Sequence, residues 1–240
     1  MNITFQQKEH AVKVTAILQQ SSSDIKALIA ESFFLEQPYF FDFTENNVEV
    51  HELNIDSNQD FDNYVQQHLH TNNTSWGIGK YGEDRLVYRN SPLFTSDGEA
   101  RSVHLAYDVW LPAGSELYAP LDARVHSFQI NDNYRDYGPT IILEHEISGL
   151  IFYTLYGHLS RTSLKGLAVN QTIKAGERVA WVGDITENGQ WPSHVHFQIM
   201  TDMINKTGDF PGVAKPSEWE QYRSMCLDPY LLFPYKKFSK

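Results

Sequence analysis

From about Gly77 onward, the hydrophobic and polar positions follow a pattern that favours β-structure. Short runs rich in Val, Ile, Tyr and Phe alternate with segments that contain Gly, Pro, Asn and Asp, as is typical of strands separated by turns. We predict strands at 124–130, 140–145, 150–156 and 178–182. The chain is therefore expected to be mainly β.

The residues before about 75 have a different pattern. Ser23 and Asp24 can cap a helix that ends before Pro38, and one nearby segment alternates apolar and polar residues like a half-buried strand. The predicted elements are a helix at 25–32, a strand at 47–55, a helix at 60–70 and a linker at 72–75.

The end of the chain carries one further helix prediction. Ser217 and Glu220 have the spacing of a capping box, so a short helix is expected after Pro216. We divide the chain into an N-terminal α/β appendage, a central domain and a C-terminal extension packed on that domain, at 1–75, 76–205 and 206–240.

Two segments of the central domain repeat each other weakly. Residues 112–117 and 174–179 both place an Ala-Gly turn just before an apolar strand. The repeat suggests two related hairpins.

Composition narrows the function classes. The net charge of −11 argues against binding to nucleic acid, anionic membranes or anionic wall polymers. The single cysteine, Cys226, forms no intramolecular disulfide, excludes a thiolate zinc cluster and favours a reducing compartment. The apolar run at 150–156 is far shorter than the roughly 20 residues that span a bilayer. Without a visible export signal, we expect a cytoplasmic protein, and export by a route that needs no cleavable signal stays open.

The segment His194-Val195-His196 carries the most chemistry. In a strand, residues two apart point to the same face, so both imidazoles project together while Val195 turns into the sheet. Upstream, His104 and Asp108 supply an imidazole and a carboxylate, which are ligands that Zn²⁺ accepts. The set predicts a metal-dependent hydrolase.

The spacing of His104 and Asp108 imposes a condition. Four residues of straight strand cover about 13 Å, whereas two zinc ligands both lie about 2 Å from the ion. These two side chains can share a metal only if the chain turns or bulges between them.

Other histidines are weaker candidates. His68 and His70 have the same spacing, but on a helix their rings would splay apart. Neither His51-Glu52 nor His145-Glu146 is followed by the second histidine of a His-Glu-x-x-His zinc helix. His126 and His145 lie on predicted strands and are expected to have structural or surface roles, and His10 carries no signal.

His158 follows the predicted strand at 150–156, where a strand meets a loop and sites often form. On its own, a structural role is as plausible as a catalytic one. Beside the other two motifs, catalysis is favoured.

In this order, the motifs His104-x-x-x-Asp108, Tyr-x-His158-Leu-Ser and His194-x-His196-Phe resemble those of the lysostaphin-type (LytM-like) zinc metallopeptidases. The resemblance covers about 76–198, and 174–183 resembles the Gly-rich hairpin that precedes the last motif in that family.

The resemblance implies residue roles, a cofactor and a mechanism. His104, Asp108 and His196 become the zinc ligands, and His158 and His194 the catalytic pair. Zinc-bound water is then the nucleophile, one histidine accepts its proton and the other stabilises the oxyanion. Which histidine has which role stays open.

The resemblance also implies a fold and a substrate class. We expect an antiparallel β-sheet or sandwich of the duplicated hybrid motif type, acting on a peptide or a peptidoglycan fragment. Biotinyl or lipoyl carriers and sugar phosphocarriers use similar hairpins, but Lys174 lacks the flanking residues of a carrier and a phosphocarrier has no need of Asp108. A non-catalytic binding module on the same fold is the alternative.

Some features depart from the family. The chain is acidic, and Trp191-Pro192 stands where the family has a Gly/Ser-rich run, so it would reshape one wall of the groove. Segments 76–85 and 208–213 look similar to a branch fused to aminotransferase-like enzymes. That likeness points to a small peptide or amide inside the cell and to an aminotransferase-linked pathway.

Overall fold

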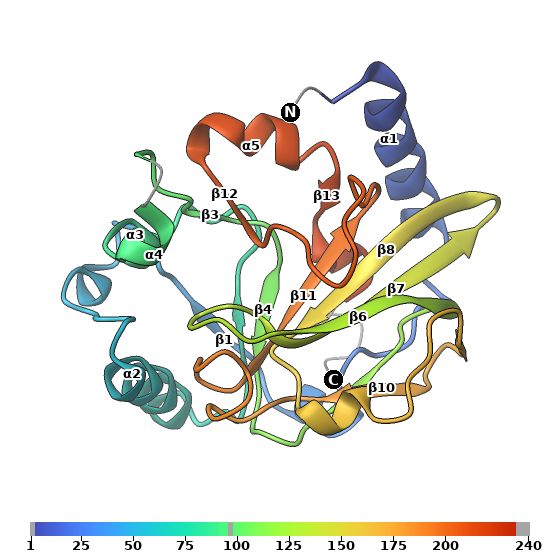
Figure 1. Cartoon of the computed structure of the whole chain (residues 1–240). Coiled ribbons are helices and arrows are strands. Elements are labelled where there is room, and N and C mark those ends of the chain that lie inside the picture. The colour runs from blue at the N-terminus through green and yellow to red at the C-terminus, as the bar shows by residue number, and fades with distance from the viewer. Residues whose placement is uncertain (1–2, 96–97, 234–240) are drawn as a thin grey trace.

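A mostly antiparallel β-sheet forms the centre of the molecule, and helices lie around it (Figure 1). The computed structural model describes residues 3–95 and 98–233. In this part of the chain the sheet has nine strands, in the order β1 (Tyr39–Phe41), β2 (Gly77–Gly79), β4 (Tyr107–Trp110), β11 (His194–Met200), β8 (Leu150–Gly157), β7 (Gly138–Ile147), β6 (Ala123–Asn131) and β9 (Thr172–Ile173), with β13 (Cys226–Leu227) also paired to β11. The prediction of a mainly β fold with an antiparallel sheet is confirmed, and only β1 and β2 pair in parallel among the strands of this sheet.

The long strands form where the sequence pattern predicted them. β6, β7, β8 and β10 (Arg178–Trp181) cover the four predicted runs. Ser148 and Gly149 join β7 to β8, and both have positive φ angles, 51° and 77°. A two-residue turn of this kind matches the twist of the flanking strands, so it fixes the register of the hairpin.

The two Ala-Gly segments form a small sheet with each other. β5 (Glu116–Tyr118) pairs antiparallel with β10. Gly114 donates its N–H to Val182 O and Gly176 donates its N–H to Ala119 O, each at 2.8 Å. Their φ angles are 81° and 80°, a conformation that favours glycine. Each turn thus binds the residue just after the strand of the other, which is the arrangement expected of an internal duplication.

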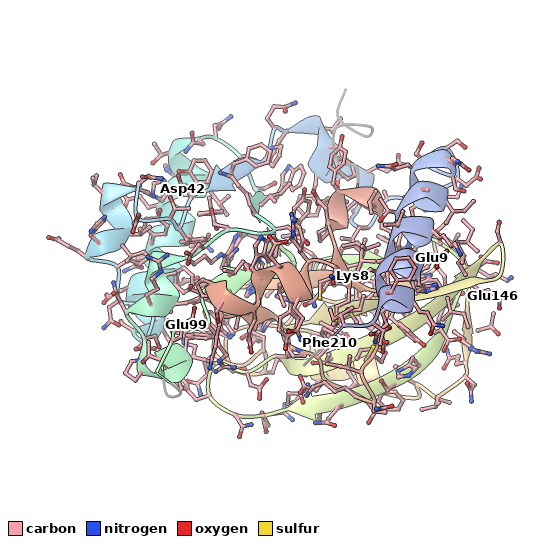
Figure 2. The ribbon with its side chains drawn as sticks, turned by 90° about the horizontal axis from the view of Figure 1, so that it is seen from above. Lys8, Glu9, Asp42, Glu99, Glu146 and Phe210 are labelled. Carbon is pink, nitrogen blue, oxygen red and sulfur yellow. The ribbon has the colours of Figure 1, made fainter. Side chains whose placement is uncertain are left out.

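The N-terminal helix was missed by the sequence analysis. α1 (Phe5–Gln20) begins with a capping box between Thr4 and Gln7 and buries Ala11, Val14 and Leu18 on one side. It lies beside the β7–β8 hairpin, as Figure 2 shows from Lys8 and Glu9 on the helix and Glu146 on β7. Phe5 and Val12 are apolar but exposed, so the apolar positions are not confined to one helical face and the helical pattern in the sequence is faint.

Two predictions in the first 75 residues were wrong. Residues 25–30 are not helical, because Ile25, Leu28 and Ile29 are all buried in the core and the chain bridges to Leu117 on β5. Residues 47–55 are not a strand. They contain the short 3₁₀ helix η2 (Val48–His51), whose Glu49 N–H donates to the Asn47 side chain. In both places tertiary packing or a local cap outweighed the sequence pattern.

Other predictions for the terminal segments were correct. The helix predicted at 60–70 is α2 (Asn58–Thr71), capped by Ser57, and the helix expected after Pro216 is η4 (Pro216–Glu218) followed by α5 (Trp219–Tyr222). The remaining elements are η1 (Glu31–Leu35), α3 (Leu86–Arg89), α4 (Pro92–Thr95), η3 (Arg161–Leu164), η5 (Pro229–Leu231), and β3 (Val103–His104) paired with β12 (Val213–Ala214).

The three-part division of the chain stays a prediction. β1 from the first part and β13 from the last part both pair within the central sheet, and residues 234–240 of the C-terminal extension lie outside the described residues. Among the described residues, none of the helices has the length and apolar character that a bilayer-spanning segment requires.

His145 gives a prediction about stability. It is buried on β7, where Nδ1 lies 3.0 Å from Asp122 O and Nε2 lies 2.8 Å from Thr154 Oγ1. Burial lowers its pKa to about 4. A histidine in the unfolded chain titrates near 6.5, so the unfolded state binds more protons between these values. The free energy of unfolding therefore falls as the pH drops from about 6.5 toward 4.

We expect His145→Gln to reduce this fall by about 2 kcal/mol between pH 7 and pH 5, measured by denaturant unfolding at the two pH values. His70→Gln, at an exposed position on α2, is the control and should behave like the wild type. An unchanged pH dependence in His145→Gln would contradict the prediction.

Candidate active site

A cavity of about 390 Å³ opens beside the central strands of the sheet. Its lining includes His104, His158 and His196, which come from three distant parts of the sequence. Trp191 also lines it, so the Trp-Pro segment before the last motif does form part of the wall. Phe210, buried in the interior and labelled in Figure 2, lines it as well.

Strand register brings three side chains together. His196 on β11 lies directly opposite Asp108 on β4, so both side chains point to the same face of the sheet. His104 ends β3, which pairs with β12 rather than with the central sheet. The chain therefore changes direction between His104 and Asp108, as their sharing of one metal would require.

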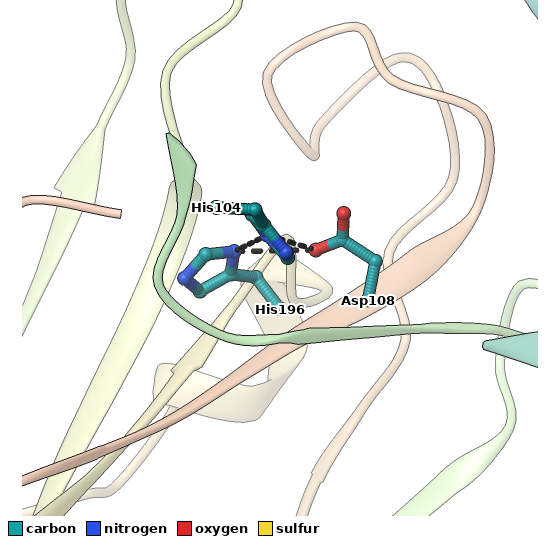
Figure 3. A group of neighbouring side chains, drawn as sticks. All are labelled: His104, Asp108 and His196. Atoms are coloured by element: carbon teal, nitrogen blue, oxygen red, sulfur yellow. Dashed lines mark hydrogen bonds and ion pairs between the residues drawn. The ribbon is translucent and has the colours of Figure 1, made fainter. Parts of the chain in front are cut away.

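The three side chains meet at one point (Figure 3). His104 Nε2 lies 3.1 Å from Asp108 Oδ1 and 3.3 Å from His196 Nδ1, and the latter two atoms are 3.2 Å apart. Tetrahedral zinc with bonds of about 2.0–2.1 Å separates its ligand atoms by about 3.3 Å. Two imidazole nitrogens and one carboxylate oxygen at these separations fit such an ion, and all three residues are buried.

Further contacts fix which ring nitrogen faces the group. His104 Nδ1 lies 3.0 Å from Lys80 O, and His196 Nε2 lies 2.9 Å from Gln198 Oε1. Donation from His196 Nε2 leaves His196 Nδ1 as an acceptor, which is the usual arrangement of a metal-binding histidine. His104 Nδ1 also lies 3.0 Å from Arg85 Nη2, which is a donor; when Nδ1 donates to Lys80 O, His104 Nε2 is likewise an acceptor.

Arg85 is a site residue that the sequence analysis missed. It is buried, and its Nη1 donates to Asp108 Oδ2 at 2.7 Å while its Nε donates to Glu83 Oε2 at 3.0 Å. The contact occupies one oxygen of Asp108 and leaves Oδ1 directed at the two histidines. No spacing in the sequence singles out this arginine, because Asp108, the partner that links it to the site, lies on β4 and far along the chain.

The electrostatics of the group follow from burial and from Arg85. Burial alone would raise the pKa of Asp108, but His104 and the Arg85 guanidinium hold it well below its usual range. Burial, together with Arg85, lowers the pKa of His104 to about 4. At neutral pH the group is thus an ionised carboxylate with a neutral imidazole, as metal ligation requires.

His158 and His194 lie next to the three-residue group. Their ring centroids are 4.3 Å apart, and His194 Nε2 is 3.7 Å from Asp108 Oδ1. His158 Nδ1 lies 2.8 Å from Asn188 O, and His194 Nδ1 lies 2.7 Å from Pro192 O. Donation from Nδ1 leaves each Nε2 as an acceptor. Burial lowers the pKa of both rings, that of His194 to about 4, so both are neutral bases.

The backbone holds His158 in an uncommon conformation. Its φ angle is 61°, which is rare for a residue other than glycine. Its N–H donates to Tyr137 O at 2.7 Å, and its carbonyl accepts from Gly183 N at 2.9 Å. The strained turn directs the ring toward His194 rather than along β8, and such strain is typical of functional positions.

The remaining histidines stay apart from this group. His68 on α2 contacts Glu49 at 2.9 Å, and His51 bonds Glu45 O at 2.8 Å. His126 packs on Tyr153, and His145 is held within the sheet. Within the described residues, the one group that could hold a metal is His104, Asp108 and His196.

Comparison with known proteins agrees with the motifs. Residues 102–207 match the model of peptidase family M23. This segment is therefore similar to peptidase family M23, and the predicted resemblance to the lysostaphin-type peptidases is confirmed. All five predicted site residues lie inside the matched segment, whereas Arg85 lies before it. No curated protein matches the chain.

Several solved structures are similar in fold. The catalytic domain of lysostaphin from Staphylococcus simulans is 21% identical, with a TM-score of 0.44 over 70% of this chain and 96% of that one. A zinc-containing peptidase from Vibrio cholerae is 20% identical, with a TM-score of 0.38 over 60% of this chain and only 33% of its own. The catalytic domain of the prophage-encoded M23 protein EnpA from Enterococcus faecalis is 20% identical, with a TM-score of 0.36 over 50% and 82%. The comparisons give no support to the aminotransferase link, which stays a prediction.

Arg85 gives a prediction about metal affinity. Without its guanidinium, Asp108 Oδ2 loses a charged partner and the carboxylate is free to rotate away from the histidines. We expect Arg85→Met to weaken Zn²⁺ binding about 10–100-fold, measured by competition with a chromogenic chelator.

Arg85→Lys keeps the charge without the two-pronged geometry, so it should lose less affinity. Glu83→Gln, which leaves the contact with Asp108 in place, serves as a second control. Circular dichroism verifies that each variant is folded. A folded Arg85→Met protein with wild-type affinity would show that Arg85 does not orient Asp108.

Proposed function

We propose that this protein is a zinc-dependent endopeptidase that hydrolyses an amide bond in a peptide or a peptidoglycan fragment. One observation carries the proposal: His104, Asp108 and His196 converge with donor separations that suit zinc. The match of residues 102–207 to peptidase family M23 supports the same reaction class. The cavity beside the group supports a substrate segment of a few residues rather than a bulky folded protein.

His104, Asp108 and His196 would hold the ion through two nitrogens and one oxygen. A zinc ion bound by three protein ligands lowers the pKa of a bound water to about 7 and polarises a carbonyl. The fourth position would face the cavity, where the substrate amide enters.

His158 and His194 would move the proton. Both rings present an unprotonated Nε2 near the metal group, which consists of His104, Asp108 and His196. Burial keeps both rings neutral until they take up a proton. One Nε2 accepts the proton of the attacking water. That histidine would later pass the proton to the leaving amine, so the reaction consumes one water and releases an acid and an amine. The other histidine, expected to stabilise the oxyanion, would donate to it once its own Nε2 has taken up a proton.

The first test separates metal binding from turnover. We expect about one zinc per chain in the wild type, measured by elemental analysis, and its loss in His104→Ala, because two ligands bind zinc much more weakly than three. His158→Ala and His194→Ala should keep the metal and lose about 10²–10⁴-fold in kcat, measured on a library of dipeptides and muropeptides.

His70→Ala, on the exposed side of α2, is the matched control and should keep both zinc and turnover. Wild-type turnover in His158→Ala and His194→Ala would contradict the role of the pair. A zinc-loaded wild type that hydrolyses none of these substrates would favour a binding module instead.

A further inference from the structure

Arg135 lines the same cavity as His104 and His196 but takes no part in the proposed hydrolysis. It lies in the connection between β6 and β7, and its residue is only 6% exposed. Its φ angle is 59°, a strained conformation for arginine. A Cβ on Gly189 would overlap Asp136 O, so the segment before the last motif packs directly against Arg135 and Asp136.

Among the described residues Arg135 makes no ion pair with an acid, and Asp56 acts on its charge only from beyond ion-pair distance. Arg135 Nη1 donates to Gln190 O at 2.7 Å and its Nη2 to Ile55 O, both of which are neutral carbonyls. Among residues 3–95 and 98–233, no carboxylate lies within 4.0 Å of its guanidinium, and its Nε has no hydrogen-bond partner. Two aromatic rings cover the group: Trp191 lies 4.5 Å from the guanidinium carbon and Tyr134 lies 5.3 Å from it.

Arg85 shows what a satisfied buried arginine looks like in this protein. It contacts Glu83 and Asp108 at 3.0 and 2.7 Å, so its charge is neutralised inside the protein. A buried charge without such a partner is destabilising, and burial lowers the pKa of Arg135 accordingly. An arginine left unpaired at the wall of a cavity is therefore suited to an anion that enters from outside.

Two other cations line the cavity. Lys206 Nζ lies 3.5 Å from Asp209 Oδ2, so its charge is paired. Arg101 donates to Leu93 O at 2.9 Å and lies over the Phe94 ring, but like Arg135 it makes no ion pair with a carboxylate among the described residues. Arg135 differs from Arg101 in being buried, and a buried charge gains more from an incoming anion.

Arg135 is close enough to the metal group to contact the same substrate molecule. Its guanidinium stacks on Trp191, whose ring centroid is 6.0 Å from that of His158. The path from Arg135 through Trp191 to His158 is no longer than about three residues of an extended peptide, which span roughly 3.3–3.6 Å each.

Neighbouring contacts make this wall firm. Tyr134 donates to Asp56 O at 2.7 Å, and Asn58 donates to Gln190 Oε1 at 3.2 Å. With the bond from Arg135 to Ile55, they tie the segment before α2 to the two loops that carry Arg135 and Trp191. These contacts hold Arg135 and Trp191 in fixed positions on the cavity wall.

We propose that Arg135 binds a carboxylate of the substrate, two or three residues from the scissile amide. Nη1 and Nη2 each carry a second N–H beyond the one that donates to Gln190 O or Ile55 O, and a carboxylate can accept from these two through parallel hydrogen bonds. Nε is buried and is not offered to the ligand. The proposal rests on the proposed function and names its substrate class, a short peptide that carries a carboxylate close to the bond that is cut. The carboxylate belongs to the C-terminus of the peptide or to an acidic side chain.

The test compares matched peptides on the zinc-loaded protein. One pair differs only in a free or an amidated C-terminus, and a second pair, amidated throughout, differs only in Glu or Gln two residues from the cleaved bond. We expect kcat/KM to be about tenfold or more higher for the acid of at least one pair, mainly through KM. The pair that shows the difference identifies the source of the carboxylate.

Arg135→Gln should remove this preference, with little effect on the amidated or Gln-containing peptide. Arg135→Lys, which keeps a charge, should retain part of it. Lys206→Gln removes one positive charge from the same cavity and should keep the preference. Because Arg135→Gln also loses bonds to the backbone, its melting temperature is measured first. If it does not fold, the wild-type comparison and Lys206→Gln still decide.

Equal rates for acid and neutral peptides in the wild type would overturn the inference and leave the proposed function standing. The inference also fails if Lys206→Gln abolishes the preference as fully as Arg135→Gln. If no peptide is hydrolysed, calorimetric binding of the four peptides to the zinc-loaded protein separates the two proposals. Tighter binding of an acid, lost in Arg135→Gln, would support the carboxylate site while the endopeptidase assignment fails, and equal binding would overturn both.

Discussion

The pairing of β4 with β11 determines the geometry of the whole site. It places His196 opposite Asp108 and His194 opposite Trp110, so one stretch of strand register positions two members of the candidate metal group and one histidine of the proposed catalytic pair. A slip of one residue would turn these side chains into the core and bring Val195 to the cavity. Because Val195 and Val109 are both fully buried in the core on the opposite face, the hydrophobic effect holds this register. The packing of apolar side chains thereby fixes the polar group.

The sequence was sufficient for the parts of the site that depend on local geometry. Alternation along a strand placed His194 and His196 on one face, and the separation of His104 from Asp108 required the change of direction that β3 and β4 show. The long strands were also predictable, because their apolar runs end at glycine-containing turns. Each of these features depends on residues that are only a few positions apart along the chain.

The predictions failed where distant packing decides. Residues 25–30 have the composition of a helix but are extended, because Ile25, Leu28 and Ile29 fill the core next to β5. The sequence around Arg85 does not reveal its role, since that role depends on its contacts with Glu83 and with Asp108 on β4. Its value to the site is electrostatic and exists only after folding brings these charges into a buried environment, where they interact more strongly than in water.

Two parts of the chain line the cavity: the M23 segment and the residues before it. The metal group and the histidine pair lie within the M23 segment at 102–207. Tyr88, Leu93 and Phe94, which line the cavity, come before it, as does Arg85. Ile55 and Asp56 bind the loop that carries Arg135. The segment before residue 102 thus shapes the cavity wall and supports both buried arginines, one paired within the protein and one unpaired. Arg135 and Trp191 lie within the M23 segment, so this segment and the residues before it build the cavity wall jointly.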